Sequence, residues 1–200
     1  MPPKAKFTRE EIQQMAFEIA RTEGIEKLTS RELGKRLGSS ARPIFTVYEN
    51  MDELKNDVIG KAKELYKQYV TNGLKKEIAF KGVGMSYIRF SIEEPILFQL
   101  LFMTPLSTLT DVTNILPLID ASYEDILKSV QDLYGLDRPA ADKLYQHLWT
   151  YTHGIAAMCA TKLCSYSEEE ISQRLTEVFT GLLFLEKNKE KSKGANNDKN

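Results

Sequence analysis

The chain has 200 residues, 42% of them hydrophobic, and a formal net charge of -1. This length and apolar content suffice for one small and one larger domain, but not for a third. A net charge near zero argues against indiscriminate binding of nucleic acid through a strongly basic surface. The longest apolar stretch, residues 96–106, is too short to span a membrane, and the N-terminus lacks a signal-peptide core, so we expect a cytoplasmic protein.

The first expected helix follows Thr8 and ends at Gly24. Thr8 and Glu11 have the spacing of a capping box, in which each side chain satisfies a backbone amide at the helix start. The apolar residues that follow have helical spacing and form one stripe: Ile12, Met15, Ala16, Ile19 and Ala20.

Residues 29–50 predict a short helix, a tight turn and a second short helix. Thr29 and Glu32 form another capping box, so the helix begins at about Ser30, and Gly38 can take the left-handed conformation that ends it. Ser39 or Ser40 can cap the second helix, and Pro43 is tolerated in its first turn. Ile44 and Tyr48 form its core face.

The outward residues of this second helix suit the major groove of DNA. Ala41, Arg42, Phe45 and Thr46 remain on its exposed side. Arginine can bind guanine through two hydrogen bonds, and small side chains let the backbone approach the bases. The alternative is an ordinary helical hairpin without a role in DNA binding.

A capping pattern at Asn50 and Glu53 begins a long helix that continues to about residue 73. With this helix in place, residues 8 to about 60 resemble the N-terminal DNA-binding domain of the TetR family of bacterial transcriptional regulators. The residues that carry the resemblance lie in the two short helices and their turn: Thr29, Arg31, Leu33, Gly34, Gly38, Ser40, Ile44, Phe45 and Tyr48.

The resemblance implies an all-α fold with two domains. Residues 1–50 would form a three-helix helix-turn-helix DNA-binding domain, joined by the connecting helix 51–73 to a helical effector-binding and dimerisation domain at 74–187. Residues 188–200 are Lys- and Asn-rich, and we expect a disordered tail there rather than a DNA-binding arm. The implied protein is a homodimeric regulator, a repressor by expectation, that binds a palindromic operator.

The residues expected to contact DNA are Thr29, Ser30, Ser40, Ala41, Arg42, Phe45, Thr46 and Lys55. Some positions depart from the family pattern. Phe45 replaces a phosphate-binding Tyr, Val47 replaces a frequent His, and Met51 stands where a Lys is common. Because Phe45 and Val47 cannot donate hydrogen bonds, we expect Thr29, Thr46, Lys55 and helix N-terminal amides to anchor the DNA backbone. These departures leave open a rival function, a dimeric helical module that binds protein partners instead of DNA.

Further helices are predicted along the rest of the chain. Residues 120–134 form an amphipathic helix whose inward side chains are Tyr123, Ile126, Leu127, Val130 and Leu133. A helix from Pro139 to about residue 163 has many small residues, and a last helix capped by Ser167 and Glu170 has a wide apolar stripe. These two helices can form a four-helix dimer interface with a second copy, or they can close the core of the monomer.

Aromatic side chains of the larger domain suggest a site for an apolar or amphipathic effector. The candidates are Tyr87, Phe90, Phe98, Phe102, Met103, Trp149 and His153. Trp149 and His153 share a helix face, where a polar ring nitrogen beside an indole can orient an apolar ligand. For any single aromatic, core packing is the commoner role, and it is their number that favours an apolar ligand.

No catalytic, metal or cofactor site is expected. The two histidines lack the Glu-x-x-His spacing of di-iron bundles, and the chain has no glycine-rich phosphate loop and no H-E-x-x-H pair. Cys159 and Cys164 do not form a C-x-x-C motif, so we expect packed thiols rather than a redox switch.

Overall fold

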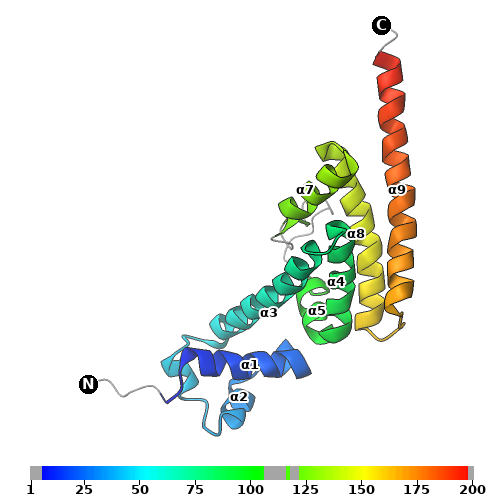
Figure 1. The fold of residues 1–200 in the computed structure, drawn as a ribbon. Coiled ribbons are helices and arrows are strands. Elements are labelled where there is room, and N and C mark those ends of the chain that lie inside the picture. The colour runs from blue at the N-terminus through cyan, green and yellow to red at the C-terminus, as the bar shows by residue number, and fades with distance from the viewer. Residues whose placement is uncertain (1–5, 106–115, 118–121, 198–200) are drawn as a thin grey trace. The chain divides into compact units, whose positions relative to one another are not determined.

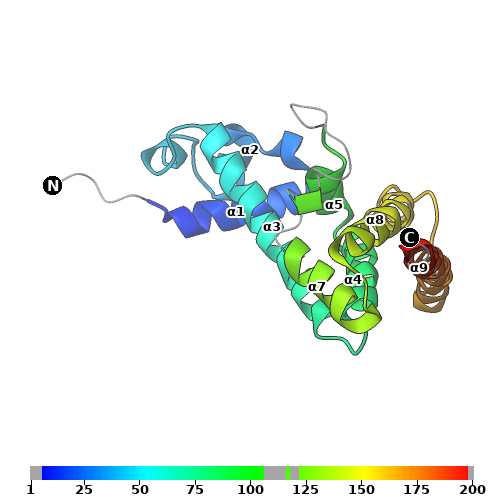
Figure 2. The same ribbon diagram turned by 90° about the horizontal axis from the view of Figure 1, so that it is seen from above.

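In the computed structural model, every regular element of the described residues is helical, which confirms the all-α prediction. The structure describes residues 6–105, 116–117 and 122–197, with side chains to residue 189. Its elements form two compact units, drawn in Figure 1 and, from above, in Figure 2. The first comprises Met1–Tyr66 and Glu93–Pro105, and the second Lys67–Ile92 and Leu106–Asn200. Within the described ranges, no helix is long and apolar enough to cross a membrane.

The first unit contains α1 (Arg9–Glu23), α2 (Ser30–Arg36), the start of α3 (Met51–Leu74) and α5 (Pro95–Phe102), with single 3-10 turns at Ile25–Lys27 (η1) and Ile44–Thr46 (η2). Both halves of the capping box at Thr8 and Glu11 are present, and Gly24 ends α1 with a φ of 97°. The core of this unit is apolar and fully buried: Ile12, Ala16, Ile19, Leu33, Ile44, Leu54, Val58 and Phe98.

The helix α5 belongs to the first unit, although the sequence placed its residues in the larger domain. Leu97 and Phe98 are buried, and α5 packs against α1. The Arg21 guanidinium also pairs with the Glu94 carboxylate, donating from Nε to Oε2 at 2.7 Å and from Nη2 to Oε1. These contacts join segments about seventy residues apart, which no local pattern indicates.

The second unit contains the end of α3, α4 (Ala79–Glu93), α7 (Tyr123–Tyr134), α8 (Arg138–Ala160) and α9 (Glu168–Asn197). The helices α8 and α9 lie side by side and antiparallel, and the C-terminal part of α9 continues beyond the start of α8 (Figure 1). Ser167 and Glu170 form a complete capping box at the start of α9. Gly135 ends α7 in the left-handed conformation, and Asp137 caps α8 by accepting from the Ala140 amide.

Two expectations differ from the structure in this unit. Leu133 was expected to point inward, but 55% of its surface is exposed, because it lies off the buried face formed by Ile126, Leu127 and Val130. The expected disordered tail is helical through Asn197, while residues 198–200 lie outside the described residues. Glu and Lys are good helix formers, and Lys189 at the start of this segment forms an ion pair at 2.9 Å with Glu186, one turn before it.

Candidate functional sites

The segment from Thr29 to Tyr48 is held by local hydrogen bonds. The Thr29 hydroxyl accepts from the Glu32 amide at 3.2 Å, which leaves its own proton free to donate. Glu32 does not complete a reciprocal cap in the manner of Glu11, because its carboxylate accepts from the Arg36 guanidinium at 2.8 Å. Thr29 is exposed, and Ser30 is the first residue of α2.

The turn after α2 is a Schellman motif. Gly38 has a φ of 63°, the Ser39 amide donates to the Gly34 carbonyl at 2.9 Å, and the Gly38 amide donates to the Lys35 carbonyl at 3.1 Å. The sequence correctly identified Gly38 as the residue that ends this helix.

The element after this turn is shorter than expected. A single 3-10 turn, η2, replaces the short α-helix predicted from Ser39 or Ser40. Pro43 provides the reason, because a proline disfavours the α conformation of the residue before it and has no amide to donate. A helix therefore cannot run from Ser40 through Arg42 without strain.

Gly34 lets this segment pack closely on α2. A Cβ atom at Gly34 would lie 3.0 Å from the Ala41 nitrogen and 3.0 Å from the Ser40 carbonyl carbon. Both are backbone atoms, so they could not move aside as a side chain can. Glycine at this position thus accompanies the tight path of the chain through Ser40 and Ala41.

The predicted DNA contacts all have some exposed surface. Arg42, Phe45 and Thr46 are exposed, Ala41 and Lys55 are half-buried, and Phe45 leaves 46% of its surface open. The Thr46 hydroxyl already donates to the Pro43 carbonyl at 2.7 Å. Since phosphate oxygens only accept hydrogen bonds, Thr46 would have to break this bond to anchor a phosphate.

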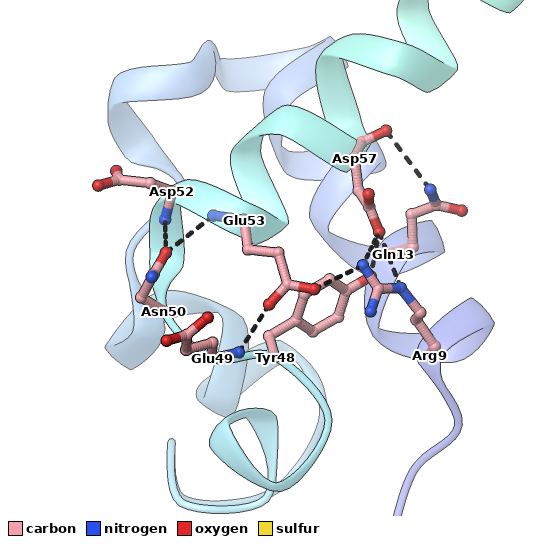
Figure 3. A network of polar contacts seen from close by, with 8 residues as sticks. All are labelled: Arg9, Gln13, Tyr48, Glu49, Asn50, Asp52, Glu53 and Asp57. Carbon is pink, nitrogen blue, oxygen red and sulfur yellow. Dashed lines mark hydrogen bonds and ion pairs between the residues drawn. The ribbon is translucent and has the colours of Figure 1, made fainter.

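A polar network fixes the end of this segment (Figure 3). Arg9 of α1 donates to Glu53 at 2.8 Å and to Asp57 at 2.7 Å, both on α3. Its guanidinium lies 4.3 Å from the centre of the Tyr48 ring, and the Tyr48 hydroxyl donates to Asp57 at 3.0 Å. Burial, and secondarily the Asp57 hydrogen bond, raise the pKa of Tyr48 to about 12, so this donor is retained at neutral pH.

The cap of α3 adjoins the same network. The Asn50 side chain accepts from the amides of Asp52 and Glu53, at 3.0 and 2.9 Å. The Glu53 carboxylate accepts from the Glu49 amide, and this bond and the Arg9 guanidinium lower the pKa of Glu53. The network thereby ties the residues after η2 to both long helices of the first unit.

The arginines of the first unit and Lys35 divide into two groups. Arg9, Arg21 and Arg36 are ion-paired with carboxylates. Arg31 and Lys35 on α2 and Arg42 beyond it are exposed, and within residues 6–105 they have no acidic partner. Unneutralised positive charge therefore remains on α2 and on the segment that follows it.

Among the predicted effector residues, the structure brings Tyr87, Trp149 and His153 together. The Trp149 and His153 rings are stacked, with centroids 4.9 Å apart. The Tyr87 hydroxyl and His153 Nδ1 lie 2.9 Å apart. Burial lowers the pKa of His153, which favours a neutral ring; its Nδ1 then accepts from the Tyr87 hydroxyl or donates to it, according to the tautomer.

The other predicted effector residues lie elsewhere. Phe90 is buried and packs edge-on against Tyr69 at 5.2 Å. Phe98, Phe102 and Met103 belong to the first unit, where Phe98 and Phe102 contact each other at 5.2 Å and Met103 is 41% exposed.

Sequence reasoning missed a cavity of about 260 Å³ in the second unit, between α4, α7, α8 and α9. Phe80, Tyr134 and Phe179 supply its aromatic walls. These residues are far apart in the chain and resemble ordinary core positions, so no sequence signal distinguishes them.

Comparison with known proteins finds similarity in structure but not in sequence. No family model and no curated protein sequence matches the chain. A solved structure from Mesorhizobium loti, of a protein provisionally assigned to the TetR family of transcriptional regulators, is similar with a TM-score of 0.50 and 15% identity. The similarity covers 88% of this chain and 95% of that chain. The chain therefore has the helical fold of a TetR-type regulator.

Proposed function

We propose that the chain is a homodimeric transcriptional regulator, a repressor, that binds a palindromic DNA operator and is released by a small apolar or amphipathic effector. The observation that carries this proposal is the exposed, unpaired basic group on α2 and the segment after it: Arg31, Lys35 and Arg42. The fold similarity to a TetR-type regulator supports it. The net charge of residues 1–63, twelve basic against ten acidic, predicts modest nonspecific affinity, so specificity would require two copies.

Within this proposal, Arg42 binds a guanine and the Thr29 hydroxyl donates to a phosphate. Arg42 is exposed, and the free proton of Thr29 fits an acceptor. Ser30, Ser40 and Lys55 add backbone contacts, Ala41 permits close approach, and Phe45 offers an apolar surface to a thymine methyl group. While the Thr46 hydroxyl donates to the Pro43 carbonyl, Thr46 makes no hydrogen bond to a phosphate and contributes only its shape to the surface.

The proposed effector site is the cluster of Tyr87, Trp149 and His153. Its stacked rings supply apolar surface, and the His153 ring supplies a polar group. If the two half-sites of the operator lie one DNA turn apart, the DNA-contacting segments of the two copies must be roughly 34–36 Å apart. An effector that favours a different spacing would release DNA, since a ligand shifts an equilibrium by its differential affinity for the two states.

A protein-binding module is the second candidate function. The shortness of η2, together with the 46% exposure of Phe45, favours it, because an exposed aromatic on an irregular segment also suits a protein partner.

Selection of genomic DNA fragments by the purified chain at two salt concentrations tests the proposal. We expect enrichment of an inverted repeat, with affinity that falls as salt rises. Failure to enrich any repeat, with an intact dimer free of ligand, would favour the protein-binding module.

Replacing Arg42 with Ala should weaken operator binding by about 1 to 3 kcal/mol and relax the preference at one base pair. The matched control is Arg138→Ala, which removes an exposed arginine of the second unit that pairs with Glu124 at 2.8 Å. The control should bind DNA as the wild type does. Unchanged specificity in the Arg42 variant, measured by fluorescence anisotropy on single-base operator variants, would remove Arg42 from the interface.

A further inference from the structure

The cavity between α4, α7, α8 and α9 has aromatic and aliphatic walls. The Tyr134 and Phe179 ring centres lie 4.8 Å apart, and those of Phe80 and Phe179 lie 5.7 Å apart. Leu148 and Leu175 complete the apolar lining. None of the residues of the Tyr87 cluster lines this cavity, so it is a separate site.

Four side chains bring polar groups to the cavity. Two threonine hydroxyls already donate to backbone carbonyls, and a tyrosine hydroxyl and a lysine ammonium remain able to donate to a ligand. Thr176 and Thr180 donate to the carbonyls of Ser172 and Thr176 at 2.8 and 2.7 Å. The Tyr134 hydroxyl and the Lys81 ammonium have no hydrogen-bond or ion-pair partner in the described part of the chain. A ligand would thus meet one cation and one free hydroxyl proton against apolar walls.

Among the described residues, no carboxylate lines this cavity. Lys81 also borders a neighbouring outer groove, which does contain the carboxylates of Glu77, Glu168 and Glu169. Glu168 is already paired there with Arg89 at 2.9 Å. The charge inside the cavity is therefore positive and uncompensated, which favours an anion.

We infer that this cavity binds a small monocarboxylic acid with an aromatic or short aliphatic body. Its carboxylate accepts hydrogen bonds from Lys81 and Tyr134, and its body contacts the rings of Phe80 and Phe179. Charge-assisted hydrogen bonds to a carboxylate are stronger than neutral ones, so the acid is preferred over a neutral analogue. The volume of about 260 Å³ lies just below the roughly 300–1,000 Å³ of sites for drug-sized ligands, which restricts the ligand to a small molecule.

Titration of the full-length protein with 3-phenylpropionate tests the inference. Methyl NMR should show saturable shifts of Leu175, a buried wall residue, at a ligand concentration where Trp149 fluorescence is unchanged. The neutral 3-phenylpropanamide should bind about tenfold more weakly or worse, since it loses the charge-assisted bonds, and 3-phenylpropylamine should bind more weakly still.

Two conservative variants locate the carboxylate. Lys81→Met keeps the length of the side chain but removes the cation, and Tyr134→Phe removes only the hydroxyl. Each should weaken the acid about tenfold and the amide less, because a neutral amide oxygen accepts a weaker hydrogen bond than a carboxylate does. Lys128→Met, which removes an exposed lysine of α7 outside the cavity, is the matched control and should bind the acid as the wild type does.

Three results would overturn the inference: no binding of the acid at millimolar concentration, equal affinity for acid and amide, or an unchanged affinity in Lys81→Met. A Trp149 response without a Leu175 shift would place the acid at the Tyr87 cluster and would also overturn it. A second copy that filled the cavity would prevent binding and give the first of these results. The test needs no DNA, so its outcome is independent of the proposed regulator function.

Discussion

At the scale of single residues, the ion pair between Arg21 and Glu94 stands out because its two partners differ in exposure. The Glu94 side chain is 7% exposed, whereas that of Arg21 is 41% exposed. Loss of the arginine would leave a buried carboxylate without its partner, which is costlier than the loss of a surface pair.

Arg21→Ala should therefore lower the free energy of unfolding by about 2 kcal/mol, less than the roughly 3–5 kcal/mol of a fully buried pair because water reaches Arg21. Urea unfolding measures the change. Arg31→Ala removes an exposed arginine that has no acidic partner within residues 6–105, and it should change stability by less than about 0.5 kcal/mol. Equal effects of the two variants would show that the pair contributes nothing specific.

His153 predicts a pH dependence of stability. Burial lowers its pKa in the folded protein below the ordinary value of 6.5, so the unfolded chain takes up a proton first as the pH falls. The free energy of unfolding should then decrease as the pH drops through about 6.5, and a His153→Asn variant should lack this part of the decrease. His147→Asn, at an exposed position of the same helix, should keep it. Chemical unfolding between pH 5 and 8 checks the difference in slope.

At the scale of elements, two glycines permit the close crossing of α3 and α4. A Cβ atom at Gly73 would lie 2.6 Å from the Gly82 carbonyl oxygen, and one at Gly82 would lie 2.2 Å from the Gly73 carbonyl oxygen. Both distances are below van der Waals contact with backbone atoms. The two helices can approach this closely only because neither residue has a side chain.

Gly73→Ala should destabilise the protein by about 1 to 3 kcal/mol, since the backbone of α4 must shift to accommodate a methyl group. Gly60→Ala lies in the same helix, where nothing is within 4 Å of the added carbon, and should stabilise by about 0.5 to 1 kcal/mol through helix propensity. Thermal unfolding of both variants should give shifts of opposite sign. A higher melting temperature of Gly73→Ala would contradict the close approach of α3 and α4 at Gly73 and Gly82.

The helix ends could be predicted from sequence because capping acts over three or four residues. At Thr8, Thr29, Asn50 and Ser167 the capping side chain accepts from the amide three residues later, and Gly38 ends α2 as predicted. The reciprocal glutamate bond forms at Thr8 and Ser167 but not at Thr29 or Asn50. The helix predicted after this turn, capped by Ser39 or Ser40, does not form. Pro43 disfavours the helical conformation of Arg42, and this effect outweighs the capping by the serines.

At the scale of the whole molecule, α9 leaves an apolar surface without a partner in the monomer. Phe184 and Leu185 expose 66% and 54% of their surface. On α8, Gly154 is exposed and has open space where a Cβ would lie, as Gly181 has on α9. Exposed large apolar side chains on α9, together with exposed glycines on α8 and α9, fit a helical interface, which supports the proposed homodimer.

Replacing Phe184 and Leu185 together with Asp should convert the dimer to a monomer, because buried carboxylates without partners are costly at an interface. Light scattering after gel filtration gives the mass. Leu133→Asp is the control, since Leu133 is 55% exposed on α7 and lies outside the proposed interface. A wild-type chain that is already a monomer at micromolar concentration, or an unaffected double variant, would remove α9 from the dimer proposal.

The candidate sites show the same division between local and distant effects. The Trp149 and His153 contact follows from a spacing of four residues on one helix, so the sequence could predict it. The hydrogen bond between Tyr87 and His153 joins residues of two helices that are 66 positions apart in the chain, and no spacing rule reaches that far. Phe98 and Phe102 could not be assigned to the first unit for the same reason.

The sequence by itself determined the helical class, the capped helix starts and the glycine ends, because hydrogen bonds and apolar periodicity over a few residues control them. Only the tertiary structure decided which distant segments meet: Arg21 with Glu94, and Lys81 with Tyr134 at one cavity. Those meetings depend on the packing of whole helices, which minimises voids across the core and which no single stretch of sequence encodes.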